Sequence, residues 1–224
     1  MLNKLILKLR KYVEKAGVNG VVFGMSGGID STVVAYLAKK ALSDKKVLAM
    51  IMPWRYTPKK DTKDAIKIAE KLGIEYKIEN IDHIVEKLDT GLDRISLGNL
   101  AARIRMTILY REANSQNLLV LGTSNRTELE LGYYTKYGDG GADLLPLGSL
   151  YKTDVRILAK KLGVPNYIIN KKPTAGLWNG QTDEDELGFT YEKIDKKLKK
   201  RDKNGLEKWV EKAKHKKGPI VLKI

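Results

Sequence analysis

Short apolar runs alternate with stretches of helical periodicity along the first half of the chain. The runs are typical of strands buried in a sheet, and they lie at 21–23, 47–52, 74–78 and 118–121. Apolar residues that recur every three or four positions predict helices, at 2–13, 33–42, 61–72, 97–114 and 150–162. Strands and helices in this order predict an α/β fold, an open parallel sheet with helices on both faces.

The predicted helix at 97–114 is apolar on two opposed faces. At about 100° per residue, one face holds Leu97, Leu100, Ile104 and Ile108, and the other holds Ala102, Met106, Leu109, Tyr110 and Ala113. A helix of this kind is buried on both sides. A second copy of the chain is the simplest cover for the second face, which predicts a homodimer; a helix sandwiched within one subunit is the alternative. Arg103 and Arg105 lie between the faces, where they would meet an anion.

The last quarter of the chain has a different character. Residues 170–188 combine Pro, Gly, Asn and an acidic cluster with little periodicity, which favours a mobile active-site cover; a disordered connector is the alternative. Residues 191–200 and 206–216 predict two short charged helices within a basic C-terminal tail, 191–224. Because no internal repeat or clear linker divides the sequence, we predict one domain over residues 1–224.

Composition narrows the possible function classes. The 224 residues suffice for a full core, and the absence of cysteine excludes disulfides, thiolate zinc sites and a thiol nucleophile. No apolar run approaches the roughly 20 residues that span a membrane, and the N-terminus lacks a signal-peptide pattern, which together predict a cytoplasmic protein. The net charge is +15, of which residues 191–224 carry +8 through thirteen Lys/Arg against five Asp/Glu. This tail would bind RNA or an anionic nucleotide, or it would have no ligand.

The strongest chemical signal is GMSGGIDS at 24–31, between the first predicted strand and the next helix. The N–H groups of a glycine-rich turn and the positive end of the following helix bind phosphate. The spacing fits neither a Walker A loop, which needs a Lys after its second glycine, nor a G-x-G-x-x-G dinucleotide fingerprint. Asp30 suits such a loop if Mg²⁺ accompanies the phosphates. The alternative is an ordinary turn in which Asp30 caps the helix.

Further polar residues are expected at the same edge of the sheet, because ligands of open parallel sheets lie beyond the carboxyl ends of the strands. Thr123 and Glu128 follow the strand at 118–121 and should lie near the 24–31 loop. The many glycines and charges of residues 133–143 favour a shaped binding loop over a plain surface turn. Lys152 stands in the first turn of a helix, where a cation is unfavourable unless an anion lies nearby.

The S-G-G-x-D-S loop resembles the pyrophosphatase loop of the PP-loop enzymes, which split ATP between its α and β phosphates. Over roughly residues 5–220 the chain resembles the ammonia-dependent NAD synthetases. The other matching motifs are GNLAARIRM at 98–106, LGTSNRTE at 121–128, TKYGDGGADLLPL at 135–147, YKTDV at 151–155, KPTAGLW at 172–178, TDEDELG at 182–188 and HK at 215–216. This resemblance implies a Rossmann-like fold of the adenine-nucleotide alpha-hydrolase type.

The resemblance also implies a ligase reaction. The carboxylate of nicotinic acid adenine dinucleotide attacks ATP, an acyl-adenylate forms and pyrophosphate leaves. Ammonia then displaces AMP to give NAD. Positioning two bound substrates supplies most of such catalysis, so a covalent protein nucleophile is not needed.

Roles for individual residues follow from the matching positions alone. ATP would contact Gly24, Met25, Ser26, Gly27, Gly28, Ile29, Asp30, Ser31, Thr123, Lys152 and Thr174. The acid dinucleotide would contact Arg103, Lys136, Asp143, His215 and Lys216. Mg²⁺ would be held by Asp30 and Glu128. Asp30, through Mg²⁺, and Lys152 would be the catalytic residues, because they offset charge that develops on the pyrophosphate.

The sequence departs from the family pattern in two ways, and two rival functions fit parts of it. LGTSN stands where many relatives have LGTDH, which leaves no acidic-histidine pair there. The chain begins just before the first strand, so we expect no glutamine-hydrolysing domain and a nitrogen supply of free ammonia or ammonia from another protein. A PP-loop enzyme that adenylates a tRNA base is the nearest rival; the missing cysteines and the lack of an RNA-binding domain oppose it. A non-catalytic nucleotide-binding module would not need Asp30, Glu128 and Lys152.

Overall fold

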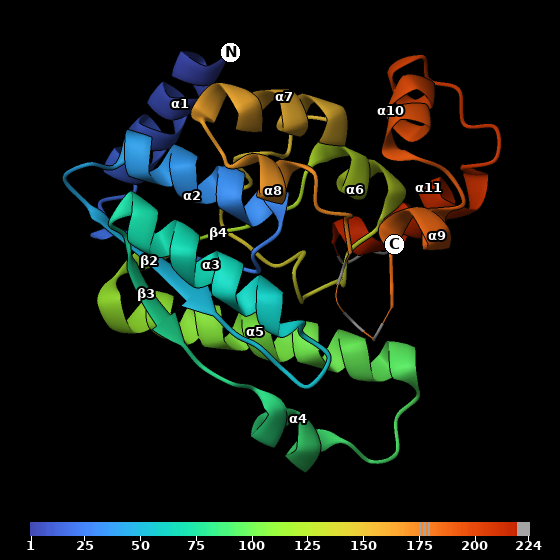
Figure 1. The fold of residues 1–224 in the computed structure, drawn as a ribbon, viewed down its shortest axis with the longest axis horizontal. Coiled ribbons are helices and arrows are strands. Elements are labelled where there is room, and N and C mark those ends of the chain that lie inside the picture. The colour runs from blue at the N-terminus through green and yellow to red at the C-terminus, as the bar shows by residue number, and fades with distance from the viewer. Residues whose placement is uncertain (175, 177, 179, 219–224) are drawn as a thin grey trace, which may run out of the picture.

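The helices and strands follow the apolar pattern, with short helices added between them (Figure 1). The computed structural model describes residues 1–174, 176, 178 and 180–218. The strands in these ranges are β1 (Gly20–Gly24), β2 (Lys46–Ile51), β3 (Glu75–Ile78) and β4 (Leu118–Leu121). The helices are α1 (Leu2–Lys15), α2 (Ile29–Ala41), α3 (Lys59–Leu72), α4 (Asp82–Leu88), α5 (Arg94–Gln116), α6 (Arg126–Leu131), α7 (Lys152–Leu162), α8 (Asn166–Ile169), α9 (Asp183–Leu187), α10 (Tyr191–Lys199), α11 (Glu207–Lys214) and the 3₁₀ turn η1 (His215–Lys217).

The strands pair in parallel in the order β3-β2-β1-β4, within the described ranges. Gly20 of β1 lies opposite Lys46 of β2 on one side and Leu118 of β4 on the other. The first strand is therefore central. The chain builds outward from it through β2 and β3, and then returns to its other side with β4. This arrangement confirms the predicted open parallel sheet.

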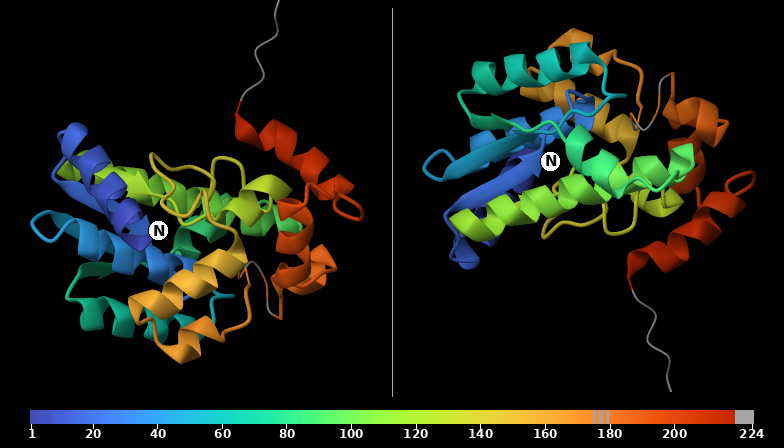
Figure 2. Two further views of the ribbon diagram at one scale, coloured as in Figure 1. Left: turned by 90° about the horizontal axis from the view of Figure 1, so that it is seen from above. Right: turned by 90° about the horizontal axis from the view of Figure 1, so that it is seen from below.

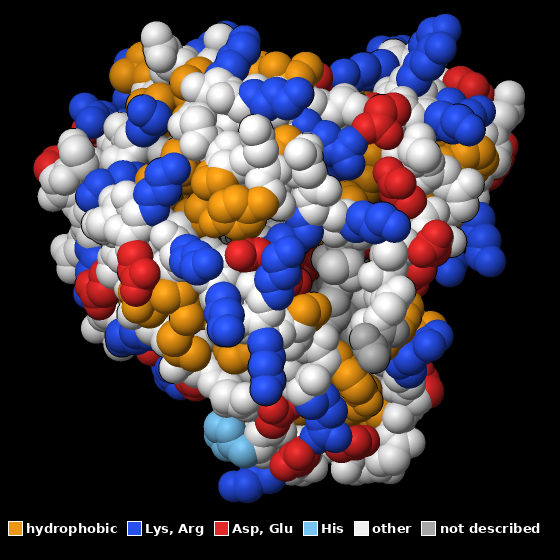
Figure 3. Space-filling view, viewed as in Figure 1, with side chains coloured by type: hydrophobic (Ala, Val, Ile, Leu, Met, Phe, Trp, Pro, Cys, Tyr) orange, Lys and Arg blue, Asp and Glu red, His pale blue; other side chains and the backbone are white. Residues whose placement is uncertain are grey.

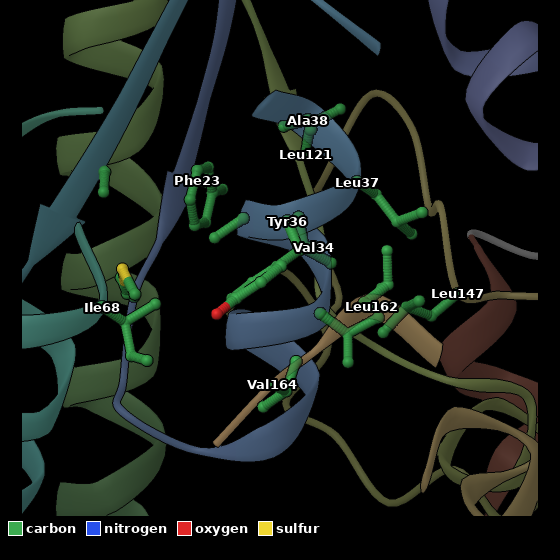
Figure 4. Close-up of a cluster of buried hydrophobic side chains, with 14 of the residues drawn as sticks. Phe23, Val34, Tyr36, Leu37, Ala38, Ile68, Leu121, Leu147, Leu162 and Val164 are labelled. Carbon is green, nitrogen blue, oxygen red and sulfur yellow. The ribbon is translucent and has the colours of Figure 1, made fainter. Parts of the chain in front are cut away.

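Helices cover both faces of the sheet because successive strand residues point to opposite faces. Val21 and Phe23 of β1 belong to a buried cluster with α1, α2, α3, α7 and α8, whereas Val22 belongs to a cluster with α4 and α5. Figure 2 shows α5 on one side of the sheet and α3 and α7 on the other. In the larger cluster, α2 packs between other elements. Figure 4 shows its neighbours Phe23, Ile68, Leu147 and Leu162 around the α2 side chains.

The C-terminal helices form a third buried cluster beside the sheet (Figure 1, orange and red). It is built from α6, α9, α10 and the residues around them, namely Leu131, Tyr151, Leu187, Tyr191, Ile194, Leu198 and Leu206. Asp195 of α10 is 1% exposed and accepts hydrogen bonds from Thr127 Oγ1 at 2.6 Å and the Thr153 N–H at 2.8 Å. The basic tail is thus packed against α6 and α7 over its described residues.

The boundaries differ from the predicted ones mainly at short elements. α3 ends at Gly73, which has the left-handed conformation (φ 57°) that its predicted stop requires. α5 runs a few residues beyond the predicted 97–114 range at each end. α4, α6, α8 and α9 were not predicted, and α9 lies within the expected 170–188 cover, whose mobility stays a prediction. Over the described ranges, none of the helices has the length and apolar character to cross a bilayer.

A loop of the same chain covers the second apolar face of α5. A Cβ added to Gly138 would lie 3.0 Å from Ala102 Cβ, and one added to Gly141 would lie 3.0 Å from Met106 Cγ. Glycine therefore lets the 133–143 loop approach the helix closely.

The residues predicted for a dimer contact are engaged within the chain. Met106 and Leu109 line the pocket described below. Tyr110 Oη donates a hydrogen bond to Asp143 Oδ1 at 3.0 Å, and Ala113 is 3% exposed. α5 is thus sandwiched within one subunit at this face, so its two apolar faces do not by themselves require a second chain. The homodimer stays a prediction.

Gly132 and Gly163 offer a matched pair for testing how the C-terminal helices are held. Both end a helix in the left-handed conformation, with φ of 64° and 76°. A Cβ at Gly132 would lie 2.7 Å from Ala213 Cα, whereas one at Gly163 meets nothing within 4 Å. We expect Gly163→Ala to cost about 1 kcal/mol of unfolding free energy. Gly132→Ala should cost roughly 1–3 kcal/mol more, measured by urea unfolding; equal costs would contradict this packing.

Candidate active site

A pocket of about 520 Å³ lies beyond the carboxyl ends of β1, β2 and β4. β1 is the point at which the strand order reverses, and such a switch point leaves a crevice at this edge of an open sheet. The start of α2, one side of α5, residues 132–141 and several of the described residues between 171 and 186 supply further walls. This is where the sequence predicted a ligand site.

The phosphate loop, residues 24–28, turns sharply between β1 and α2. Gly27 has φ +79°, a conformation that favours glycine. Within the turn, the Gly28 N–H donates to Ser26 Oγ at 3.2 Å, and Thr32 Oγ1 donates to the Gly28 carbonyl at 2.8 Å. Ser26 Oγ and Ser31 Oγ are also hydrogen bonded, at 3.1 Å. The loop is therefore shaped by its own polar groups at the positive end of α2.

A buried lysine holds two carboxylates together next to this loop. Lys152 Nζ, at the start of α7, donates to Asp30 Oδ2 at 2.5 Å and to Glu128 Oε1 at 3.3 Å. The Lys152 side chain is 3% exposed, and those of Asp30 and Glu128 are 17% and 16% exposed. The Lys152 N–H donates to Thr127 Oγ1 at 3.0 Å. The predicted anion near Lys152 is thus supplied by the protein's own carboxylates.

Asn125 connects the same two carboxylates. Its Nδ2 donates to Asp30 Oδ1 at 3.2 Å. It also caps α6, because its Oδ1 accepts from the Glu128 N–H at 3.1 Å while its own N–H donates to Glu128 Oε2 at 3.2 Å. Asn125 is the second of the two positions at which LGTSN departs from LGTDH, so here an amide orients the acidic pair.

Burial and charge shift the pKa values of this cluster. Burial raises the pKa of Glu128, against the lowering effect of the Lys152 charge. Burial alone would lower the pKa of Lys152, but the charges of Asp30 and Glu128 outweigh it and raise that pKa. Lys152 therefore remains a cation near neutral pH, as a partner of phosphate must.

Most of the predicted ATP and metal positions line the pocket. Among the described residues these are Gly24, Met25, Ser26, Gly28, Ile29, Asp30, Ser31, Thr123, Glu128, Lys152 and Thr174, together with Lys216 of the predicted dinucleotide set. The other predicted residues lie outside the lining, namely Gly27, Arg103, Lys136, Asp143 and His215. Arg103 and His215 are exposed.

Asp143 supports the fold in this structure. Its Oδ2 accepts from the Val120 N–H of β4 at 2.8 Å, and its Oδ1 accepts from Tyr110 Oη at 3.0 Å. The carboxylate thus binds the edge of the sheet to the 133–143 loop. Its predicted contact with a dinucleotide stays a prediction.

Lys136 and Lys216 fasten the loop and the tail to each other. Lys136 Nζ donates to the carbonyls of His215 and Gly218 at 2.5 and 3.1 Å. In return, Lys216 Nζ donates to the carbonyls of Gly132 and Tyr134, each at 2.6 Å. Both predicted substrate lysines therefore hold backbone here, and they bring the tail to the rim of the pocket.

Asp183 is a pocket residue that the sequence analysis did not identify. Tyr191 Oη donates to its Oδ2 at 2.9 Å and Tyr133 Oη to its Oδ1 at 3.3 Å. Burial raises the pKa of Asp183, although Lys152 and these hydroxyls act in the opposite direction. The TDEDELG motif contained the signal, but nothing in its spacing distinguished this acid from its neighbours.

Arg105 is the arginine of α5 that reaches the pocket. Its Nε donates to the Met52 carbonyl at 2.9 Å, and its guanidinium lies 5.9 Å from the centre of the Trp54 ring. Burial lowers its pKa to about 10, so it remains positively charged at neutral pH. The sequence placed Arg103 and Arg105 alike between two apolar faces, and the structure separates them.

The carboxylates of Asp30 and Glu128 fit a Mg²⁺ ion that is shared with phosphate. In the described part of the chain, no three His, Cys, Asp or Glu side chains are grouped so as to hold a metal. Mg²⁺ is usually bound by one or two carboxylates together with phosphate oxygens and water. The donor set therefore suits a metal that arrives with a nucleotide better than one held by protein alone.

The pocket as a whole suits a nucleoside triphosphate. Loop N–H groups and the positive end of α2 attract phosphate, and the Lys152 ammonium lies beside them. Apolar and aromatic lining residues such as Met52, Leu109 and Trp178 offer a surface for a base.

Comparison with known proteins identifies the sequence relatives. The sequence profile of the NAD synthase family matches residues 1–220. The NH₃-dependent NAD⁺ synthetase of Pyrococcus horikoshii is 54% identical over 200 residues, which cover 88% of this chain and 77% of that protein.

Solved structures of related enzymes share the fold. An NMN synthetase from Francisella tularensis is 38% identical with a TM-score of 0.93, and the match covers 99% of this chain and 96% of that one. An NH₃-dependent NAD synthetase from Campylobacter jejuni is 37% identical with a TM-score of 0.81, covering 99% and 97%. The Rossmann-like fold expected from the PP-loop resemblance is thereby confirmed.

Proposed function

The chain belongs to the NAD synthase family, and we propose on this basis that it forms NAD from nicotinic acid adenine dinucleotide, ATP and ammonia. The observation that carries the proposal is the meeting of the phosphate loop, Lys152 and two carboxylates in one pocket. The acid carboxylate attacks the α-phosphorus of ATP and pyrophosphate leaves. Ammonia then attacks the acyl-adenylate carbonyl, AMP leaves and a proton is lost, which gives the amide.

The first half-reaction is supported by the charged groups of the pocket. Loop N–H groups at the start of α2 bind the β and γ phosphates. The ammonium of Lys152 turns from its carboxylate partners toward the leaving group, where it offsets the developing negative charge. Mg²⁺, bound by Asp30, Glu128 and phosphate oxygens, would supply Lewis-acid stabilisation of the same charge. Asn125 orients both carboxylates for this task.

The contacts of the acid substrate are proposed from the family resemblance. Lys216 lines the pocket and supports such a contact directly. Lys136 and His215 meet Lys216 at the loop and tail, so a dinucleotide bound there would replace the backbone carbonyls that the lysines hold now. Arg103 and Asp143 are carried into the set by the motif match alone.

The tRNA-modifying rival has no support among the relatives, all of which are named for the synthesis of NAD or NMN in the matches reported above. On the face seen in Figure 3, lysines and arginines are scattered among acidic and apolar side chains without forming a single stripe. We also propose that the protein is cytoplasmic.

A second candidate function follows from the likeness to the Francisella NMN synthetase, which suggests a mononucleotide as the acid substrate. Steady-state assays with ATP, Mg²⁺ and ammonium separate the two. We expect kcat/KM for nicotinic acid adenine dinucleotide to exceed that for nicotinic acid mononucleotide, with AMP formed in equal amount to NAD. Omission of ammonium is the control. A preference for the mononucleotide would favour the second candidate, and no AMP with either acid would contradict both.

Asp30→Asn tests the metal role. The amide keeps the size of the side chain but loses the charge that would hold Mg²⁺, so we expect turnover to fall by about 10²–10³-fold in a protein that remains folded. Asp44→Asn, at an exposed position, is the control and should leave turnover unchanged. Near wild-type turnover of Asp30→Asn at saturating Mg²⁺ would remove the metal role.

We also propose that the protein is a homodimer. Three exposed apolar side chains lie close in sequence before and at the start of α5: Leu88, Leu92 and Ile95 have 53%, 38% and 57% of their surface accessible, and Ile95 also lines the pocket. Such a patch favours association. Sedimentation velocity at micromolar concentration should give the mass of two chains, and Ile95→Asp should shift it toward one. A wild-type monomer at that concentration would sink the proposal.

A further inference from the structure

Lys171 binds the phosphate loop at the Gly27 carbonyl. Its Nζ donates to the Gly27 carbonyl at 2.9 Å. The same ammonium contacts Asp61 Oδ1 at 2.8 Å and Asp64 Oδ2 at 2.5 Å, in the first two turns of α3. Three segments that are far apart in the sequence meet at this cation, whose side chain is only 18% exposed.

These contacts use every donor that Lys171 has. An ammonium carries three N–H bonds, and one goes to each of Gly27, Asp61 and Asp64. While it makes them, Lys171 has none left for a phosphate oxygen, and two carboxylates offset its charge. Lys171 lines the pocket as Lys152 does, but its three N–H bonds are taken by the loop and by α3, whereas the contacts of Lys152 are with the two carboxylates of the pocket. The arrangement of Lys171 is therefore that of a group that holds the loop.

The Gly27 carbonyl matters because it shares a peptide with the Gly28 N–H. The described peptide bonds are all trans, and in a trans peptide the C=O and N–H point in opposite directions. With the carbonyl directed at Lys171, the N–H is directed at Ser26 Oγ, 3.2 Å away. Ser26 and Gly28 both line the pocket, whereas Gly27 does not. Lys171 thus sets the direction of the Gly28 N–H, which would donate a hydrogen bond to an entering phosphate oxygen.

Close packing reinforces this arrangement. A Cβ at Gly27 would lie 2.2 Å from the Asp61 carbonyl oxygen, so the loop backbone lies directly against the first turn of α3. Lys171 and α3 therefore support the same turn of the loop, one by hydrogen bonds and the other by contact.

We propose that Lys171, held by Asp61 and Asp64, is a positioning residue for the pyrophosphate part of ATP. It acts through the Gly27 carbonyl and does not touch the nucleotide. Because it lies three residues before Thr174, it also fastens the start of the 170–188 segment to the phosphate loop. The proposal rests on the proposed function only in taking ATP as the ligand.

The test compares ligands that contain the pyrophosphate with one that lacks it. Calorimetry on the full chain, with Mg²⁺ and without acid substrate or ammonia, gives the Kd of inorganic pyrophosphate, ATP and AMP. We expect Lys171→Met to weaken pyrophosphate and ATP by about 10-fold or more and to leave AMP within about twofold. Lys63→Met removes the same charge from an exposed position of α3 and should change none of the three.

Two further variants keep the test informative if Lys171→Met does not fold. Lys171→Arg retains the charge and a donor for the carbonyl, and should recover most of the pyrophosphate affinity. Lys171→Met leaves the Asp64 carboxylate buried without its partner, and adding Asp64→Asn removes that charge. We expect this double variant to bind pyrophosphate more weakly than the wild type. An equal loss for all three ligands, or wild-type pyrophosphate binding by the double variant, would overturn the inference.

The outcomes also separate this inference from the proposed function. A wild-type chain that binds ATP but forms no NAD or NMN would contradict the function and leave the role of Lys171 open to the same binding comparison. A wild-type chain that forms NAD while Lys171→Met binds all ligands normally would contradict only the role of Lys171.

Discussion

The contact of Lys152 with Asp30 and Glu128 is the interaction on which the rest of the site depends. Each residue lies in the first turn of a helix at the same edge of the sheet, so one buried cation joins the exits of β1 and β4 to α7. Loss of the shared Lys152 would leave both carboxylates without a cation, which is strongly destabilising, whereas loss of one carboxylate leaves Lys152 the other. The groups proposed for catalysis therefore also hold together the elements that carry them.

The sheet and its covering helices could be predicted from the sequence because long apolar patterns report burial directly. Helices such as α6 and α9 are too short to show periodicity, and only neighbouring structure makes them form. The phosphate loop, Glu128 and Lys152 were found from motif and strand position. The role of Lys171 was not, because its partners Gly27, Asp61 and Asp64 lie more than a hundred residues away.

The two apolar faces of α5 also show what a sequence pattern cannot predict. The apolar pattern correctly required burial on both sides but carried no information on what does the covering. The 133–143 loop, which has no periodicity, covers the second face by bringing glycine backbone against Ala102 and Met106. Arg103 and Arg105, two positions apart, consequently have different surroundings, one exposed and the other at the pocket wall.

The position of Asp143 has a consequence for solubility. β4 is the last strand of the described sheet, and an unpaired strand edge can recruit strands from other molecules. Here the Val120 N–H is taken by the Asp143 carboxylate, the Val120 carbonyl by the Asp143 N–H, and the Gly122 N–H by the Leu144 carbonyl. The loop that shapes the pocket thus also covers the β4 edge of the sheet at Val120 and Gly122. Any event that lifts this loop exposes a hydrogen-bonding template for intermolecular β-pairing, so an intact binding loop also protects the protein from aggregation.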